Sequence, residues 1–246
     1  GLRHNRRREP MPNPLHWCQI PGFCARQSAG MKKPLYILLL LLATLLLLAY
    51  AFRETLMERV DSLRTASMFV PAERADFSPG PAVGSTFPGL QASFEGKRVT
   101  LLTDFAGPNG TLLVALRSVD WCPYCKRQLV QLQEHQPFFT ASGIGLVAIS
   151  YDSPEAQADF AQRFDISLPL LSDNNALSFR TLGILNESYQ PGDSEYGVPH
   201  PGMIIVDDDN KVVGKLFLKD FGQRVDSAAA LAYARRELGL TQPFGR

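Results

Sequence analysis

An uninterrupted apolar run from Leu35 to Phe52 restricts what this chain of 246 residues can become more than any other feature. Its 18 residues carry no charge, and one threonine and two tyrosines are its only polar side chains. A helix of that length covers about 27 Å, close to the ~30 Å hydrocarbon core of a bilayer. No polar residues mark an outward face, as they would on a helix of a globular core. We therefore expect a single transmembrane helix, with the anchor or signal segment at residues 34–52.

The charges around this run indicate its orientation. Residues 1–33 carry seven Lys and Arg but a single Glu, while the rest of the chain has more acidic than basic residues. The positive-inside rule then predicts that everything after Phe52 is exported. A cleaved secretory signal is the alternative, because the run follows Met31-Lys32-Lys33 and ends at the cleavage-like Ala49-Tyr50-Ala51. Both interpretations place the C-terminal part outside the cytoplasm, in a periplasmic or other extracytoplasmic position.

Composition divides the chain into four parts. Residues 1–33 lack periodicity and are rich in Arg, Pro and Asn, so we expect a basic disordered tail. Three residues of this tail could bind a metal but match no common zinc spacing: His16, Cys18 and Cys24. The apolar segment follows, and then residues 53–80 read as a stalk helix and a Pro- and Gly-rich linker. Residues 81–246 remain for a folded domain with a core of its own. The net charge of +1 argues against a general nucleic-acid binder.

Hydrophobic patterns in the last part predict alternating strands and helices. Short apolar runs indicate strands at 99–105, 111–116, 145–150, 168–171, 203–206 and 212–218. Longer stretches with capping residues indicate helices at 122–135, 154–164, 174–182 and 226–238. Strands that alternate with helices and end in a hairpin imply an α/β fold, in which a mixed central sheet is flanked by helices.

The most informative motif is Trp121-Cys122-Pro123-Tyr124-Cys125, which lies between a predicted buried strand and a predicted helix. A cysteine at a helix N-terminus feels the positive end of the helix dipole and unpaired backbone N–H groups, and both stabilise its thiolate. The spacing places the second cysteine one turn further into the helix. We therefore expect Cys122 to be the exposed, attacking thiol with the lower pKa, and Cys125 to be the buried resolving thiol.

Two structural roles for this pair are the alternatives to catalysis. A purely structural disulfide is possible in an oxidising compartment. Half of a zinc site is the other role, but the exported part has no second Cys-x-x-Cys or Cys-x-x-His motif to complete it. The pair is thus self-contained. Neither a metal nor an organic cofactor is implied, because the dithiol itself is the redox centre.

Four further segments carry a resemblance to a known family. They are Leu129-Val130-Gln131-Leu132, residues 147–155 (VAISYDSPE), residues 168–173 (LPLLSD) and residues 201–207 (PGMIIVD). Together with the loop at 117–125, and in this order, they resemble thioredoxin-fold proteins of the alkyl hydroperoxide reductase/thiol-specific antioxidant (AhpC/TSA) superfamily, in its peroxiredoxin-like branch. The resemblance covers about half of the chain, residues 99–218.

The resemblance implies a thioredoxin-like fold, an antioxidant-type redoxin activity and a substrate groove beside the cysteines. Trp121, Pro123 and Tyr124 would line that groove. Pro201 would be a cis-proline that faces the pair, with Pro199 as the other choice. The implied partners are a protein dithiol or disulfide, or a peroxide, together with a thiol electron donor, and a homodimer is possible.

One departure from the family pattern separates two functions. Peroxiredoxins place Thr or Ser three residues before the attacking cysteine, and this chain has Val119 there. We therefore expect a membrane-anchored, extracytoplasmic thiol–disulfide oxidoreductase, with thiol peroxidase activity at Cys122 as the alternative. A redoxin-fold binding module without turnover is a third hypothesis, which the presence of both cysteines argues against.

Overall fold

The computed structural model describes residues 32–240, and the chain divides into two compact units, residues 1–58 and 59–246, which are treated separately. The expected basic tail lies outside the described residues except for Lys32 and Lys33. Its candidate metal ligands, His16, Cys18 and Cys24, therefore lie outside them too.

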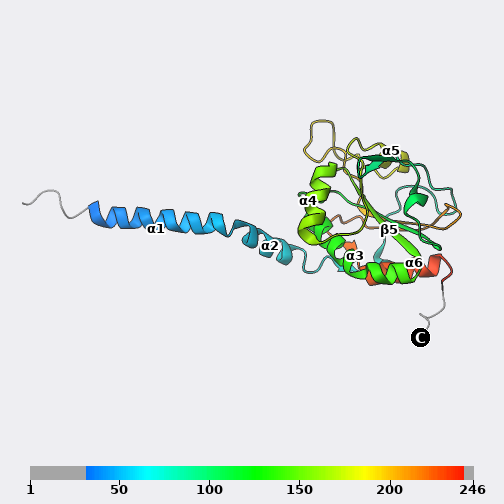
Figure 1. Cartoon of the computed structure of the whole chain (residues 1–246), viewed down its shortest axis with the longest axis horizontal. Coiled ribbons are helices and arrows are strands. Elements are labelled where there is room, and N and C mark those ends of the chain that lie inside the picture. The colour runs from blue at the N-terminus through cyan, green and yellow to red at the C-terminus, as the bar shows by residue number, and fades with distance from the viewer. Residues whose placement is uncertain (1–31, 241–246) are drawn as a thin grey trace, which may run out of the picture. The chain divides into compact units, whose positions relative to one another are not determined.

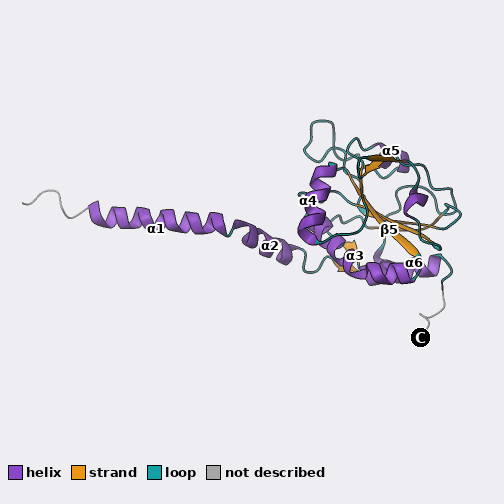
Figure 2. Cartoon of the chain, in the orientation of Figure 1, coloured by secondary structure: helices purple, strands orange, loops and turns teal. Residues whose placement is uncertain are grey.

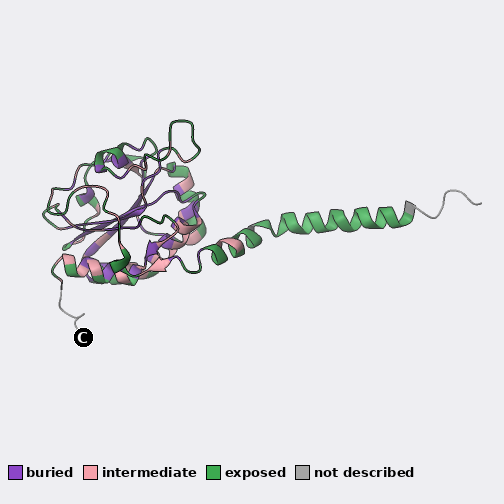
Figure 3. Cartoon of the chain, turned by 180° about the vertical axis from the view of Figure 1, so that it is seen from behind, coloured by how far each residue is buried: buried purple, intermediate pink, exposed green. Residues whose placement is uncertain are grey.

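In the first unit, α1 (Lys32–Ala51) is one helix over the apolar run. Its residues Lys33–Ala51 are long and apolar enough to cross a membrane, and none of them is buried (Figure 3). Within residues 32–240 it is the one helix with this property. The predicted apolar helix is confirmed. α2 (Arg53–Arg64) follows it along the chain.

A mixed seven-stranded sheet forms the centre of the second unit, in the order β3-β2-β6-β5-β4-β7-β8 (Figures 1 and 2). The strands of this sheet are β2 (Ala92–Phe94), β3 (Lys97–Val99), β4 (Gly110–Ala115), β5 (Ile144–Ser150), β6 (Leu170–Ser172), β7 (Gly202–Val206) and β8 (Val212–Phe217). β4, β5 and β6 are parallel, and the outer strands pair antiparallel. Two short strands, β1 (Phe69–Val70) and β9 (Arg224–Val225), form a separate parallel pair.

Alternation along the central strands sorts their side chains into two cores. In β4, Leu112 and Val114 belong to one core, while Leu113 and Ala115 belong to the other. The first core is covered by α3 (Pro123–Ala141), α4 (Pro154–Phe164) and α6 (Ser227–Glu237), and the second by α5 (Leu177–Leu182). α3 and α6 contact each other and run side by side in Figure 1. The predicted α/β architecture, a mixed sheet flanked by helices, is confirmed.

The predicted strand at 99–105 and the predicted helix at 174–182 differ from the structure because local contacts decide them. The predicted strand at 99–105 is wrong, since Val99 ends β3 and Leu102–Phe105 forms a 3₁₀ turn. α5 begins at Leu177 rather than at 174. The Asp173 carboxylate accepts hydrogen bonds from the N–H groups at the start of this helix, which fixes its first turn.

The motif-bearing helix is longer than its sequence pattern predicts. α3 continues past His135 and Pro137 to Ala141. A proline inside a helix removes one backbone hydrogen bond and costs about 3 kcal/mol. Beyond the proline, Phe139 is fully buried between the helix and the sheet core. Its packing offsets the cost of the proline and holds the last turn in place.

The folded unit begins well before residue 81, where its start was expected. β1 lies inside the segment 53–80 that composition identified as stalk and linker, and it pairs with β9. Met68 and Ala72 are buried in the same segment. The N–H groups of Asp76 and Phe77 both donate to the carbonyl oxygen of Phe217, at 3.2 and 3.3 Å. Pro and Gly here bend a segment that is tied to the domain by backbone hydrogen bonds.

Candidate active site

The Cys-x-x-Cys motif lies where β4 ends and α3 begins, at the carboxyl edge of the parallel strands. Cys122 is the N-cap residue of α3, with extended backbone angles (φ −89°, ψ 105°), and Pro123 occupies the first turn. A proline is tolerated there because the first N–H groups of a helix have no intrahelical partner. The N–H groups of Cys125 and Lys126 both donate to the Cys122 carbonyl oxygen at 3.1 Å. The motif thus opens the helix as predicted.

The loop before the motif is fixed by a buried carboxylate, Asp152. The Ser118 hydroxyl donates to Asp152 Oδ1 at 2.6 Å, and the Val119 N–H donates to Oδ2 at 2.7 Å. Ser118 Oγ accepts in turn from the N–H groups of Asp120 and Trp121, at 2.9 and 3.2 Å. Sequence reasoning missed this role. The available signal was position, because Asp152 lies two residues after the strand that runs parallel to β4, so both loops leave the same sheet edge.

Both cysteines of the motif are free and buried. Cys122 is 1% exposed and Cys125 0%, so the predicted exposure of Cys122 is wrong. A hydrogen bond to Cys125, together with burial, raises the pKa of Cys122. Burial also acts to raise the pKa of Cys125, but the hydrogen bond from Cys122 and the positive charge of Arg224 lower it below the ordinary thiol value. The structure therefore favours the thiolate on Cys125, whereas sequence reasoning predicted it on Cys122.

The cation responsible, Arg224, is almost completely buried, with 2% of its surface exposed. Its Nη2 donates to Cys125 Sγ at 3.4 Å, and its Nη1 donates to the carbonyl oxygens of Phe221 and Gln223. The Arg224 N–H donates to the carbonyl oxygen of Met68 at 2.8 Å, next to β1. Sequence reasoning missed Arg224, because it lies 99 residues from Cys125 and belongs to no recognisable motif.

Aromatic side chains surround a second arginine near the motif. The Arg117 guanidinium lies over the rings of Trp121, Phe221 and Tyr189, at 5.0, 4.7 and 5.8 Å from their centroids. Its Nη2 also donates to the Tyr189 hydroxyl at 2.9 Å. Trp121 Nε1 donates to the Tyr151 hydroxyl at 2.8 Å. Since Trp121 and Phe221 are 39% and 53% exposed, an aromatic surface flanks the dithiol.

The remaining predicted groove residues lie nearby, with one correction. Tyr124 is partly buried beside Gly222, close to the segment that leads to Arg224. Pro201 is buried and lines a small internal cavity together with Gln128 and Arg224. The peptide bond before Pro201 is trans, so the predicted cis-proline is wrong, and Pro199 is trans as well. Trans is the lower-energy isomer of an X-Pro bond.

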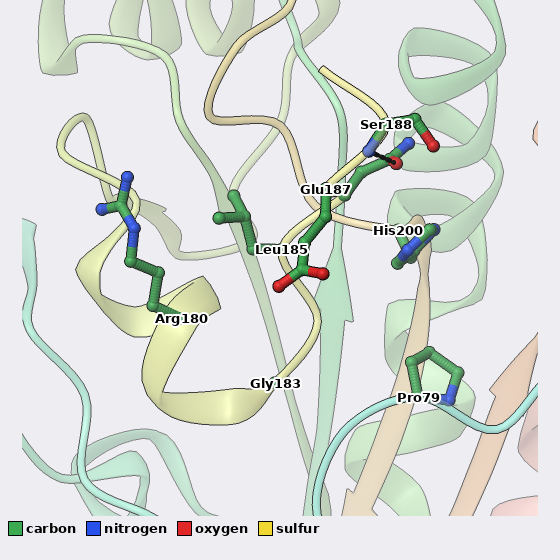
Figure 4. A pocket seen from close by; sticks show the side chains of 8 residues that line it. Pro79, Arg180, Gly183, Leu185, Glu187, Ser188 and His200 are labelled. Carbon is green, nitrogen blue, oxygen red and sulfur yellow. Dashed lines mark hydrogen bonds between the residues drawn. The ribbon is translucent and has the colours of Figure 1, made fainter. Parts of the chain in front are cut away.

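A separate cavity of about 580 Å³ opens beside His200 (Figure 4). It is lined by Pro79, Arg180, Gly183, Leu185, Asn186, Glu187, Ser188 and His200. Figure 4 shows the Glu187 carboxylate between Arg180 and His200. Partial burial lowers the pKa of His200, and its ring meets Phe77 edge-on at 4.9 Å. Neither cysteine lines this cavity. Among residues 32–240 the cysteines are those of the motif, so this cavity is separate from the dithiol.

Comparison with known sequences identifies relatives of two kinds. The model of the AhpC/TSA family matches residues 83–215. The thiol-disulfide oxidoreductase ResA of Geobacillus thermodenitrificans is 29% identical over 152 residues, which cover 59% of this chain and 78% of that protein. A Mycobacterium tuberculosis protein that is provisionally named a peroxiredoxin is 29% identical over 118 residues, 48% of this chain and 71% of the relative.

Solved structures show the same fold. The peroxidoxin BcpB of Mycobacterium tuberculosis is similar with a TM-score of 0.54 and 20% identity, over 65% of this chain and 98% of that one. A thiol peroxidase from Chromobacterium violaceum gives a TM-score of 0.52 and 24% identity, over 66% and 89%. This confirms the predicted thioredoxin-like fold. Since the family model spans more than half of the sequence, the chain belongs to the AhpC/TSA family and is an oxidoreductase of the redoxin type.

Proposed function

We propose that this chain is a thiol–disulfide oxidoreductase that works through the Cys122–Cys125 dithiol. The observation that carries the proposal is the arrangement of the pair: two buried cysteines at a helix N-terminus, with a cation against the inner sulfur. An arrangement that stabilises a thiolate is what disulfide exchange needs, because the thiolate is the nucleophile. A purely structural disulfide would gain nothing from a buried arginine beside one sulfur.

In the proposed reaction, Cys122 forms the bond to the substrate. Its proton passes to Cys125, and the backbone N–H of Cys125 stabilises the resulting Cys122 thiolate. This thiolate attacks one sulfur of a substrate disulfide, whose S–S bond breaks as the first substrate thiol leaves. Cys125 then loses its proton and attacks the Cys122 sulfur, and the second substrate thiol leaves. The substrate gains two electrons and two protons, and the pair becomes a disulfide that a thiol donor must reduce.

The groove residues have separate parts in this proposal. The exposed ring of Trp121 and the half-buried ring of Tyr124 border the pair and provide the docking surface for a protein substrate. Pro123 sets the first helical turn that carries Cys125. Pro201 is buried and lines the same small cavity as Arg224, so its part is to pack beside that arginine.

The experiment compares single serine variants of the two cysteines in cells, by non-reducing electrophoresis. Cys125→Ser should trap mixed disulfides between Cys122 and the physiological substrate, because no resolving thiol remains. Cys122→Ser should form none, and the double variant is the matched control. Adducts with Cys122→Ser alone would reverse the two roles. Absence of adducts in every variant would support a structural disulfide or a binding module instead.

Peroxidase activity is the second candidate, because one relative carries a peroxiredoxin name. The loop before Cys122 provides little that could orient a peroxide. Val119 occupies the position where the family pattern has a hydroxyl, and the neighbouring Ser118 hydroxyl is committed to Asp152. We expect slow hydroperoxide turnover with a thiol donor, and a gain in rate from Val119→Thr. A wild-type rate as fast as that of dedicated peroxidases would make peroxide reduction the better description.

A further inference from the structure

The proposed exchange does not yet say in which step one charged group beside the dithiol acts, the buried guanidinium of Arg224. Its Nη2 contacts Cys125 Sγ at 3.4 Å, and the side chain is 2% exposed. Within residues 32–240 no carboxylate pairs with it, and its Nε has no hydrogen-bond partner. A buried cation without an anion is costly. The sulfur of Cys125 is the group in contact that can carry the balancing charge.

Other charges near the motif are engaged elsewhere. Arg117 lies against aromatic rings and the Tyr189 hydroxyl. The Asp152 carboxylate accepts from Ser118 and Val119, and the neighbouring Asp120 is exposed to solvent. Among the described residues, the charged groups that shift the pKa of the two thiols are the partner cysteine and Arg224.

We propose that Arg224 is a catalytic residue of the second half of the exchange, in which it holds the negative charge on Cys125 while Cys122 is bound to substrate. This rests on the proposed function. The proposal assigns a role to a residue that neither the family match nor the motif identifies, and it names the step of the exchange in which that residue acts.

The need for such a cation arises in the mixed disulfide. Once Cys122 is bonded to substrate it has no S–H, so Cys125 loses the hydrogen bond that helps to stabilise its thiolate. Burial then opposes ionisation, and the stabilising groups that remain are the Arg224 guanidinium and the backbone N–H of Ser118. The Cys125 thiolate attacks the Cys122 sulfur, one S–S bond forms as the other breaks, and the electron pair leaves on the substrate thiolate. The proton that Cys125 released to solvent is replaced on the departing thiol.

The same contact acts in the reverse direction. When a donor thiolate attacks the Cys122 sulfur of the oxidised protein, Cys125 is the leaving group. A leaving thiol of lower pKa departs faster, so Arg224 speeds the opening of the disulfide. The oxidised pair has no thiolate to balance the charge of Arg224, whereas the reduced pair has the Cys125 thiolate. Arg224 therefore favours the reduced form.

The test follows both halves of the exchange in single turnovers with the aromatic disulfide DTNB as the probe. The full chain is used in detergent, with Cys18 and Cys24 replaced by serine in every variant. Attack by Cys122 releases one coloured thiolate, and resolution by Cys125 releases a second. The variants are Arg224→Gln, Arg224→Lys and, as the matched control, Arg127→Gln. Arg127 is an arginine on α3 that contacts Thr65 and not the cysteines.

The informative readout is the pH profile of the second release. In the wild type we expect this profile to level off below the ordinary thiol pKa of about 8.5. In Arg224→Gln it should shift upward by at least about one pH unit, so that resolution in acid slows about tenfold per unit. Arg224→Lys should stay near the wild type, because the charge is kept, and Arg127→Gln should match it.

The outcomes separate the two proposals. Coincident second-release profiles in wild type and Arg224→Gln, with a normal first release, would overturn the role of Arg224 and leave the proposed function intact. A first release that persists in Cys122→Ser would overturn the proposed function. If Arg224→Gln does not fold, the wild-type profile alone decides, since an apparent pKa at or above about 8.5 contradicts the proposal.

An equilibrium measurement against glutathione gives an independent readout. Loss of the charge in Arg224→Gln should make the pair more reducing, with Arg224→Lys restoring the wild-type value. A tenfold shift in the equilibrium constant corresponds to 29.6 mV for this two-electron couple. An unchanged constant in a folded Arg224→Gln protein would contradict the proposal.

Discussion

Which sulfur of the dithiol holds the negative charge depends on contacts made by single residues far apart in the sequence. The Cys-x-x-Cys motif is visible in the sequence, and the helix N-terminus at Cys122 follows from local rules. The cation beside Cys125 does not follow from local rules, because Arg224 lies 99 residues further along the chain. For this reason helix position alone points to Cys122, whereas the contact with Arg224 favours the charge on Cys125.

The pH dependence of stability should report that thiolate. The pKa of Cys125 is lowered on folding, so the unfolded chain binds more protons than the folded one below the ordinary thiol pKa of about 8.5. Its contribution is therefore present above that pH and is lost as the pH falls. We expect the reduced wild type to gain stability over Cys125→Ser as the pH rises from about 6 to 8.

Denaturant unfolding of both proteins in excess reductant, at several pH values, measures this difference. The oxidised wild type, which has no thiolate, is the control and should lack the trend. A stability difference that falls with rising pH would place the thiolate elsewhere.

The buried carboxylate of Asp152 should matter as much as a core side chain. Asp152→Ala removes the acceptor of the Ser118 hydroxyl and of the Val119 N–H, and leaves both donors unpaired. Each unsatisfied buried donor costs about 1–3 kcal/mol. We expect a drop in the unfolding free energy of at least about 2 kcal/mol by denaturant titration. Asp120→Ala, a change at the exposed neighbour, should stay within about 0.5 kcal/mol of the wild type.

At the scale of elements, periodicity predicted the strands and helices whose own residues determine where they lie. It failed where contacts with residues distant in the sequence determine the element or its end. β4 and β5 are continuous apolar runs because both of their faces are buried. The end of α3 was missed, since Pro137 is a local stop signal and the burial of Phe139 is a property of the assembled core. β1 was missed because a two-residue strand has no period to detect.

β1 links the start of the domain to the proposed active site. It pairs with β9, whose first residue is Arg224. A chain that begins at residue 81 lacks this partner and also loses the buried side chains of Met68 and Ala72. We expect residues 81–246 to be less stable than residues 59–246 by several kcal/mol, because burial of a large apolar side chain is worth about 1.5–3 kcal/mol.

Thermal unfolding of the two fragments in the same buffer measures the loss. The shorter fragment should also show an upward shift of the second DTNB release, since Arg224 is no longer held. Equal melting temperatures would mean that the segment is a linker after all.

At the scale of the whole molecule, the order of elements was sufficient to predict the α/β class and, with the resemblance, the family. It did not predict that the antiparallel hairpin β2–β3 would extend the sheet beyond β6. Pairing partners distant in sequence depend on loop closure and packing, which a one-dimensional pattern does not contain.

We expect the full chain to be a single-pass membrane protein whose redox domain lies outside the cytoplasm. The basis is the uncharged span of α1 and the basic residues before it. The protein should fractionate with membranes, resist extraction at high salt, and lose its C-terminal domain to protease added from outside. N-terminal sequencing of the mature protein tests the cleaved-signal alternative, since a start at Phe52 would contradict an anchor. Resistance to external protease would contradict export.

The burial of Arg224 also has a consequence for the ionic conditions under which the protein can work. Dissolved salt weakens electrostatic attraction through the solvent, with a Debye length that falls from about 30 Å at 0.01 M to 3 Å at 1 M. The contact between Arg224 and Cys125 lies in a region that solvent hardly enters, as both side chains are at most 2% exposed. The redox equilibrium of the pair should therefore be nearly independent of ionic strength. A domain exposed to an outside medium of changing salinity would keep the same driving force for electron transfer.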